Sequence, residues 1–379
     1  MKTRIIFALA AMLLTLFVAE AQVQIRQREA IRLVYDVDFE MNFDNREFYE
    51  SEFSKSMTIF GSRLTPSMGL TVHNAAGVTH SVMVGLDVMK EFGAPMSSPK
   101  ELIGEPTLYY KLEKDCGRMD LELYAGMFSR KNSEGRYSEA FFSDSLKFYD
   151  NNLEGLLVKF RLPRAYYEIG CDWMGQYGPT ERERFMIFSN GEGKVAPFLT
   201  LGYSGYMYHY ANSMIVGGVV DNILVNPYAR LDFARVTGFQ TLSFRFGWLQ
   251  GFQHDRKNVG HYVRPSGAEF DFEVRKWNMG IRNSMFYGTD MMPYYNSCDA
   301  GGFKYGNDLY FGDPFYRIHD VSGEGPGMYD RFEVFWNPYV GRYLDIKVRA
   351  LFHIHESGYS GCQQVVSLNF NIDRLINRR

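Results

Sequence analysis

The histidines near the C-terminus are the residues with the clearest capacity for metal chemistry. His353 and His355 lie two residues apart, so both imidazoles share one face if this stretch is a β-strand, and Glu356 follows. Two imidazoles and a carboxylate can bind zinc. Polar lining residues explain the same pair, and His254 and His261 show no ligand spacing. We therefore expect no metal ion and no cofactor.

Catalytic sequence motifs are missing from the chain. It contains no GxSxG elbow, no HExxH and no Walker loop. Pairs such as His–Ser or Asp–His are recognised by geometry rather than by sequence, and a chain with 8 histidines offers candidates. The residues alone favour a protein that is not an enzyme.

A row of carboxylates is the third candidate for chemistry. In residues 33–44, LVYDVDFEMNFD, apolar and polar residues alternate, and Asp36, Asp38 and Glu40 occupy polar positions. Successive side chains of a strand point to opposite faces, so these carboxylates gather on one face. They suit an active site or the lining of a polar interior.

The same alternation recurs almost to the C-terminus and predicts strands with one apolar face. Glu269, Asp271 and Glu273, for example, are separated by apolar residues. Pro66 cannot donate to a ladder and predicts a bulge or split in its strand. About sixteen strands (range about 14 to 18) are expected from this pattern. They lie near 31–43, 56–73, 79–90, 106–114, 118–128, 154–162, 165–175, 184–190, 195–208, 220–234, 238–252, 267–276, 278–288, 329–338, 342–354 and 362–373.

The connections between these strands alternate in length along the chain. The long ones are 44–55, 91–105, 129–153, 176–183, 209–219, 253–266, 289–328 and 355–361. The short ones are 74–78, 115–117, 163–164, 191–194, 235–237, 277 and 339–341. An outer-membrane barrel has tight turns at one end and long loops at the other, whereas a soluble sandwich has no reason to sort its loops.

The N-terminus predicts export. Lys2 and Arg4 precede the apolar run 5–18, and a small-x-small site ends at Ala21, so residues 1–21 form a signal peptide and 22–379 one barrel domain. No other stretch approaches the ~20 apolar residues of a spanning helix. A net charge of −3 excludes the polybasic signature of a nucleic-acid partner.

The composition agrees with strands and turns. Aromatic residues make up 16% of the chain, and it has 36 glycines but only 13 prolines. The 4 cysteines show no metal-finger spacing, and the sequence leaves open whether they pair or remain thiols. They are Cys116, Cys171, Cys298 and Cys362.

The alternation, the loop parity and the last strand, VVSLNFNID, resemble Gram-negative outer-membrane β-barrels of the porin type. The chain departs from that pattern by continuing through RLINRR. The stretches YYEIGCDWMGQYG and FRFGWLQGFQHD also resemble uncharacterised barrels of Bacteroides-type bacteria. The resemblance implies an all-β, antiparallel up-and-down transmembrane barrel with short periplasmic turns and long extracellular loops.

The resemblance also implies location and partners. The protein is expected in the cell outer membrane, in contact with lipid and lipopolysaccharide, after insertion by the assembly machinery. Whether copies associate as a homo-oligomer stays open. Two aromatic girdles are expected from Trp173, Trp277, Trp336, Tyr339, Tyr166 and Tyr167.

In such a barrel the apolar face meets lipid and the polar face lines the lumen. Acidic and basic sectors could then sort solutes with a transverse field, or neighbouring strands could neutralise each other. The residues expected in the lumen are Asp36, Asp38, Glu40, Asp120, Glu122, Lys159, Arg161, Arg230, Arg245, Glu269, Asp271, Glu273, Lys347, Arg349 and His353.

The longest loop combines aromatic rings with acids, which suits sugar binding. A lid, a constriction or a plug is an equally open role for so long a loop. Its candidate binding residues are Tyr294, Tyr295, Tyr305, Asp308, Tyr310 and Asp313.

Three functions fit these residues and this resemblance. The first is a porin-like channel for polar solutes, including saccharides. The second is a surface barrel that binds glycan or a partner through its loops. The third is a barrel enzyme acting on lipid or peptide.

Overall fold

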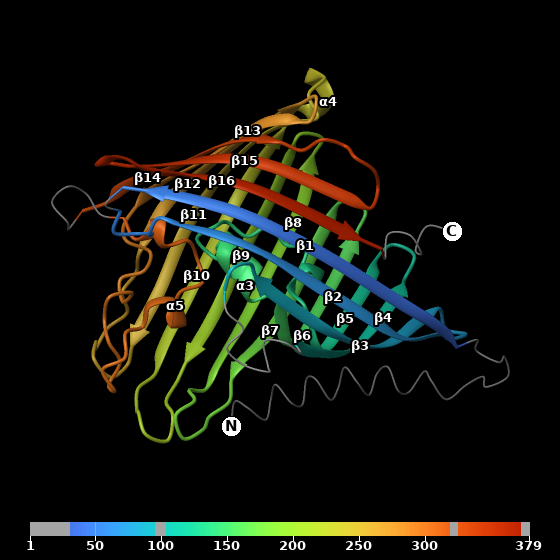
Figure 1. The fold of residues 1–379 in the computed structure, drawn as a ribbon, viewed down its shortest axis with the longest axis horizontal. Coiled ribbons are helices and arrows are strands. Elements are labelled where there is room, and N and C mark those ends of the chain that lie inside the picture. Colours follow the sequence, from blue (N-terminus) through green and yellow to red (C-terminus); the bar gives the residue numbers. More distant parts are fainter. Residues whose placement is uncertain (1–30, 50, 95–103, 319–324, 373–379) are drawn as a thin grey trace.

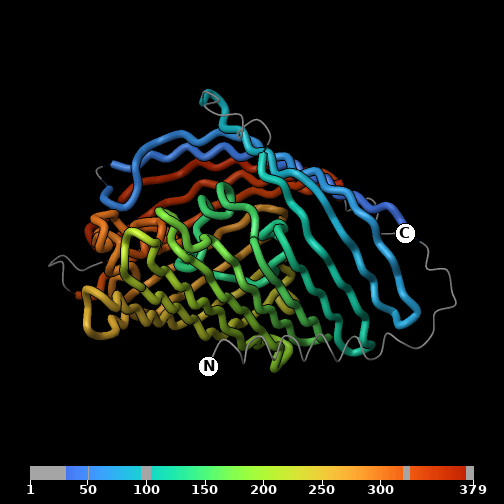
Figure 2. Tube along the Cα trace, turned by 90° about the horizontal axis from the view of Figure 1, so that it is seen from below, coloured from blue at the N-terminus to red at the C-terminus, as the bar shows by residue number. Residues whose placement is uncertain are grey.

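The computed structural model describes residues 31–49, 51–94, 104–318 and 325–372. The expected signal peptide and the terminal RLINRR lie outside the described residues. Sixteen antiparallel strands form one closed barrel, because β1 pairs with β2 on one side and with β16 on the other. Figures 1 and 2 show the first and last strands side by side in this wall.

The strands match the sixteen expected from alternation, and the predicted fold class is confirmed. They are β1 (Arg32–Phe48), β2 (Met57–His73), β3 (Val78–Glu91), β4 (Glu105–Asp115), β5 (Asp120–Ser129), β6 (Asn152–Leu162), β7 (Ala165–Gly175), β8 (Arg184–Ala196), β9 (Leu199–Tyr210), β10 (Val220–Asp232), β11 (Thr241–Asp255), β12 (Ser266–Lys276), β13 (Met279–Gly288), β14 (Gly327–Trp336), β15 (Leu344–His355) and β16 (Gly358–Asn371).

Short helical turns occur only in connections of the described chain. They are η1 (Arg130–Asn132), α3 (Asp144–Tyr149), α4 (Ala234–Thr237), α5 (Gly306–Leu309) and η2 (Pro314–Tyr316). None of these is long and apolar enough to cross a membrane. Figure 1 places α4 and α5 at opposite ends of the barrel.

The expected bulge or split at Pro66 is wrong. β2 runs unbroken, and its pairing with β3 keeps one register from Leu64 opposite Val88 to Ser67 opposite Gly85. Pro66 pairs with Val37 of β1, whereas the β3 ladder omits both Thr65 and Pro66, the latter lacking an N–H to donate. This gap in the pairing leaves the register of the strand unchanged.

The expected alternation of long and short connections holds for most of the chain and fails at the β10–β11 and β15–β16 connections. The β14–β15 connection runs over 337–343 instead of the expected 339–341. Residues 191–194 belong to β8, and the turn falls at 197–198. The β10–β11 connection is longer than expected, at 233–240, because it contains α4. The expected long loop 355–361 is only the turn 356–357, since β15 and β16 extend further than their apolar pattern indicated.

Apolar side chains cover the outside of the wall. Large apolar residues on alternate strand positions are exposed, among them Leu64, Met68 and Val84. Trp277 and Tyr339 are 81% and 79% exposed at short turns, and Trp336 and Trp173 are also exposed. Tyr166 is an exception to the expected girdles. It neighbours the outward Tyr167 and therefore points inward, where its hydroxyl bonds Glu168.

The buried apolar core lies inside the barrel rather than between two sheets. It joins inward wall residues such as Phe128 and Tyr206 to Phe141, Phe142 and Phe315 of two long connections. A lumen lined only by polar residues was the expectation, so this aromatic core is an addition that alternation did not reveal. All four cysteines are free thiols.

The orientation of the faces can be tested on β1. Phe39 lies midway along the strand, opposite Leu64 and Phe370, so Phe39→Arg places a charge among lipid-facing residues at a cost of ~2–4 kcal/mol. We expect this variant to lose the folded band that resists SDS without heating. Asp38→Asn, one residue away on the other face, should fold normally. Normal folding of Phe39→Arg would show that the faces are inverted.

Candidate functional site

The β5–β6 connection, residues 130–151, crosses the lumen and contacts inward side chains around the ring. Lys131 pairs with Asp38 and Glu40 of β1, the latter at 3.0 Å. The backbone carbonyl of Arg136 accepts from Asn190 Nδ2 at 3.1 Å on β8. Contacts to strands this far apart in the sequence hold the connection inside the barrel.

Glu168 of β7 is the wall residue that anchors this crossing. It is fully buried, and it accepts hydrogen bonds from the backbone N–H of Glu134 and Gly135 at 2.9 and 3.0 Å. The Ser133 and Tyr137 hydroxyls donate to the same carboxylate at 2.6 and 3.1 Å. A side chain on Gly135 would stand about 2.6 Å from Asn190 Cβ, so only glycine allows this close approach.

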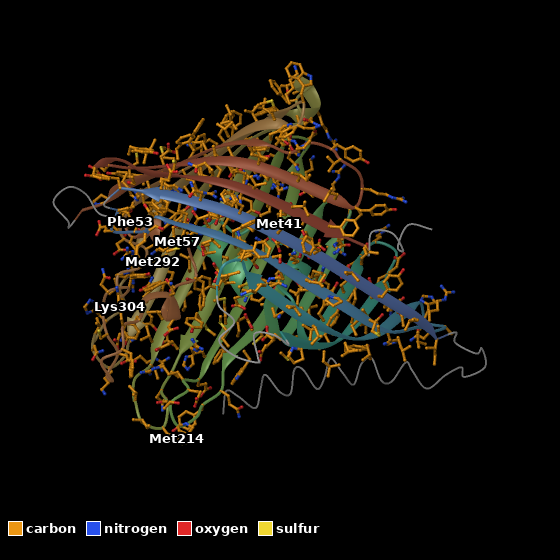
Figure 3. The ribbon with its side chains drawn as sticks, viewed as in Figure 1. Met41, Phe53, Met57, Met214, Met292 and Lys304 are labelled. Carbon is orange, nitrogen blue, oxygen red and sulfur yellow. The ribbon has the colours of Figure 1, made fainter. Side chains whose placement is uncertain are left out.

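The β13–β14 connection packs on the first one. The Ser143 N–H donates to the Phe311 carbonyl at 2.9 Å, and the Asp313 N–H donates to the Glu139 carbonyl at 2.7 Å. Together residues 130–151 and 289–318 form a plug, which fills the lumen nearer the long loops. In Figure 3, Met292 and Lys304 lie at that end, and Met214 lies at the tip of another long loop there.

The plug places the tyrosines proposed for sugar binding mostly in its interior. Tyr294, Tyr305 and Tyr310 are buried. The Tyr305 hydroxyl donates to Asp255 at 2.7 Å, and that of Tyr310 to Gln253 at 2.6 Å. Their rings and hydroxyls therefore attach the plug to the wall and do not form an exposed platform.

The other loop candidates have separate positions. The Tyr295 ring packs under the guanidinium of Arg317 at 4.2 Å. Asp308 is exposed and forms a long ion pair with Arg184 at 3.5 Å. Asp313 caps η2 by accepting from the Phe315 N–H at 3.1 Å.

A polar cavity of about 890 Å³ extends from the plug toward the short-turn ends of the strands. Of the residues predicted to line the lumen, the following line this cavity: Glu40, Arg230, Arg245, Glu269, Asp271, Glu273 and Arg349.

Opposite charges pair along the inner wall of the barrel. Arg245 bonds Glu269 and Asp271 at 2.8 and 2.6 Å. Arg230 bonds Glu192 at 3.2 Å, and Lys347 bonds Glu333 at 3.0 Å. The predicted acidic and basic sectors therefore neutralise one another across adjacent strands, which reduces any transverse field.

Other residues predicted to line the lumen either lie near an end of the barrel or form ion pairs. Asp36 accepts from Asn371 at 3.3 Å, and Asp120 is exposed at the start of β5. Glu122 pairs with Lys159 at 2.8 Å and also with Arg161.

The C-terminal histidines make structural contacts. His353 is fully buried and bonds Tyr329 and Gln363 at 2.8 and 2.9 Å. His355 bonds Ser360 at 2.7 Å. The described residues contain no group of three or more metal-ligating side chains of the His, Cys, Asp and Glu types.

Arg136 was not singled out in the sequence. It is exposed to the lumen, lines both the large cavity and a smaller one of about 260 Å³, and its guanidinium has no partner in the part of the chain that the structure describes. Because its backbone is fixed to the wall, its charge is held at one place in the lumen.

Two plug carboxyls have shifted pKa values in opposite directions. Burial opposes ionisation of Asp144, but Arg349 and two further cations hold its pKa well below the ordinary value. Burial raises the pKa of Asp313 to about 6, against the lowering effects of the Phe315 N–H and of Arg331. Asp144 is thus charged at all ordinary pH values, whereas Asp313 titrates.

A second group of side chains that could take part in acid–base chemistry lies on the outer surface, at the end of the barrel with the long loops. Cross-strand pairing aligns one residue from each of five neighbouring strands in a single row. The row is Trp173, Phe185, His209, Asp221 and His254, from β7 to β11. These side chains point outward, because Tyr208, Tyr210 and Asn222 beside them contact the plug.

The centre of this row is a polar cluster. His209 Nδ1 lies 3.3 Å from Asp221 Oδ1, and Arg256 Nε donates to Asp221 Oδ2 at 2.6 Å. The Phe185 ring flanks the imidazole at 5.0 Å and stacks on Trp173 at 5.4 Å. The sequence did not reveal this cluster, because its members come together only through strand register.

The next outward row, one step deeper along the strands, is apolar throughout. It consists of Cys171, Ile187, Met207, Ile223 and Phe252. The His209–Asp221 pair therefore stands at the boundary between an apolar surface and the polar rim.

Comparison of the sequence with known families is decisive. Residues 25–311, about three-quarters of the chain, match the family described as lipid A 3′-O-deacylase-type. The chain belongs to this family. The expectation that the protein is not an enzyme is wrong, because the lipid A 3′-O-deacylase-type family is named for an enzyme.

Several solved structures are similar to this chain. OpdO of Pseudomonas aeruginosa is 9% identical, with a TM-score of 0.50 over 89% of this chain and 96% of that one. OccD3 (OpdP) of the same organism is 10% identical, with a TM-score of 0.45 and coverages of 89% and 91%. A triple mutant of Rhodopseudomonas blastica porin is 10% identical, with a TM-score of 0.45 and coverages of 89% and 100%. The likeness to OpdO confirms the predicted porin-type barrel. No curated protein matches.

The raised pKa of Asp313 gives a pH dependence of the plug. The folded plug keeps a proton that the unfolded loop, with its ordinary pKa of 3.8, releases, so stability is lost as pH rises from about 4 to about 6. We expect stronger hydrogen-exchange protection of residues 309–318 at pH 5 than at pH 7, after correction for intrinsic rates. Asp313→Asn should remove this difference. Asp308→Asn, on the same loop but exposed, should retain it; equal pH dependence in both variants would contradict the assignment.

Proposed function

We propose that this protein is an outer-membrane hydrolase that removes an ester-linked acyl chain from lipid A in the outer leaflet. The observation that carries the proposal is the outward His209–Asp221 pair, which lies directly above an apolar row. The ester carbonyls of a lipid lie where its acyl chains meet its polar headgroup. A lipid whose chains cover the apolar row would thus present an ester at the height of the imidazole.

The pair has the geometry of a general base and its orienting carboxylate. When Nδ1–H donates to Asp221, Nε2 of His209 is the free basic nitrogen. It takes a proton from water while the water oxygen attacks the acyl carbonyl carbon. The acyl C–O bond then breaks, the imidazolium returns the proton to the leaving alkoxide, and a fatty acid and an alcohol result.

Arg256 completes the cluster from the loop above. Its Nε holds Asp221, and its side chain is 54% exposed, so the remaining N–H groups can face the developing negative charge on the carbonyl oxygen or a neighbouring phosphate.

Hydrolysis by the folded protein in lipid A micelles tests this site. We expect His209→Ala to lower the rate of fatty-acid release, followed by mass spectrometry, by about 100-fold or more, the usual contribution of a general base. Asp221→Asn should also lower it, because the imidazole loses its orienting carboxylate.

His80→Ala is the matched control. His80 lies at the short-turn end, where it bonds Tyr110 at 2.6 Å, and its loss should leave the rate unchanged. Full activity of His209→Ala would show that the proposed site is wrong.

A second candidate, a channel for polar solutes that include saccharides, is favoured by the polar cavity within the barrel. The plug narrows the lumen, and Arg136 is a cation of the cavity lining whose guanidinium has no partner in the described parts of the chain. Because the Arg136 guanidinium is positively charged, a solute path that passes it would favour anions.

Planar-bilayer recording tests the channel. We expect Arg136→Glu to shift the reversal potential of the open current toward cation selectivity. Arg118→Glu, the same charge change on an exposed short turn, should not shift it. A folded wild-type barrel that never conducts would exclude the channel.

A further inference from the structure

We propose that Arg331 and Arg349 form a binding site for a phosphate group inside the lumen, and that Asp144 of the plug occupies this site as an internal ligand. A phosphate that displaces Asp144 would release α3 from the far wall. The proposal concerns the lumen and does not depend on ester hydrolysis at His209.

The contacts of Asp144 are those of a bound anion. A single carboxylate oxygen, Oδ2, accepts from Arg331 Nη2 at 3.2 Å and from Arg349 Nη1 at 3.0 Å. These arginines lie on β14 and β15, 187 and 205 residues away from Asp144 in the sequence. The loop thus reaches across the barrel to place one oxygen between two guanidinium groups.

The two arginines have more donors than Asp144 uses. The Nε atoms of Arg331 and Arg349 are buried and have no hydrogen-bond partner among the described residues. The Arg331 side chain is only 6% exposed, so water is a poor substitute. A phosphate offers several strong acceptor oxygens in place of one, and planar guanidinium forks bind it in bidentate fashion.

The neighbouring wall carboxylates are already engaged with other cations. Glu273 bonds Arg282 at 2.9 Å, and Glu333 bonds Lys347 at 3.0 Å. Glu333 lies 3.9 Å from Arg331, at the limit of an ion pair. Arg331 is also attracted by Glu139, which lines the same cavity. Without Asp144, Arg349 would lose the ion pair that it forms at 3.0 Å, which favours an anion from solution at this position.

The site is accessible from inside the barrel. Asp144, Arg331 and Arg349 all line the cavity of about 890 Å³. Arg46 and Ser145 lie beside them in the same lining, and Arg46 Nη2 donates to Ser145 Oγ at 2.7 Å. A soluble phosphate in the cavity can therefore reach the arginines, and these two side chains could add further donors.

Displacement would loosen a defined segment. Besides Asp144, α3 is attached to the wall by Arg46 and by Arg63, which donates to the Phe148 carbonyl. Removing the ion pairs of Asp144 leaves these hydrogen bonds to neutral acceptors, so residues 138–149 would exchange amide hydrogens faster while the strands stay unchanged.

Calorimetric titration of the detergent-folded, full-length barrel with inorganic phosphate tests the site, with chloride at equal ionic strength as the blank. We expect Asp144→Asn to bind phosphate about tenfold or more tighter than wild type, because the competing carboxylate is lost. Arg349→Gln should abolish binding. Arg282→Gln, on the same cavity wall, should bind as wild type does.

Hydrogen exchange provides the second readout. Phosphate should raise exchange of residues 138–149 in wild type and not in Arg349→Gln. Glycerol phosphate in place of inorganic phosphate distinguishes a phosphomonoester ligand from the free ion; binding of either supports the site, and binding of neither overturns it.

Three other results would also overturn the proposal. The first is a phosphate affinity of Asp144→Asn that is no greater than that of wild type. The second is an equal loss of phosphate affinity in Arg282→Gln and Arg349→Gln. The third is unchanged amide hydrogen exchange of residues 138–149 at saturating phosphate. Asp144→Ser serves as the second variant if Asp144→Asn fails to show the SDS-resistant folded band.

Discussion

Every other feature of this protein depends on the pairing of its first strand with its last. Backbone N–H and C=O groups within a bilayer have no water to bond, so a sheet that crosses it cannot keep a free edge. Pairing of β1 with β16, from Asp38 opposite Asn371 to Phe48 opposite Gly361, removes that edge. Closure then divides the alternating side chains into an outer apolar surface and an inner polar one.

This division explains why the wall tolerates many charges. Inside the barrel, acids and bases on adjacent strands lie within reach of each other, as Arg245 does between Glu269 and Asp271. The plug follows the same rule at longer range in the sequence, since Lys131 pairs with Glu40 of β1 and Asp144 pairs with Arg349 of β15. It also adds an aromatic core, so the interior combines a packed half and a polar half.

The sequence predicted well what depends on local periodicity and poorly what depends on register. All sixteen strands follow from alternation, because each strand shows its own two faces. The outward row could not be predicted: His209 and Asp221 are 12 residues apart, and they meet only because of how β9 and β10 are staggered. The role of residues 130–151 was equally hidden, since a loop that folds inward carries the same polar and aromatic residues as one that folds outward.

The anchoring of α3 has a consequence for the order of assembly. Its partners Arg46 and Arg63 come from β1 and β2, and Arg331 and Arg349 come from β14 and β15. These four strands lie on the two sides of the seam where the sheet closes. Until β1 pairs with β16, Arg46 and Arg63 are not held next to Arg331 and Arg349. The short helix α3 can therefore make all of these contacts only in a closed wall, so its docking, unlike that of residues 133–137 on Glu168, depends on closure of the seam.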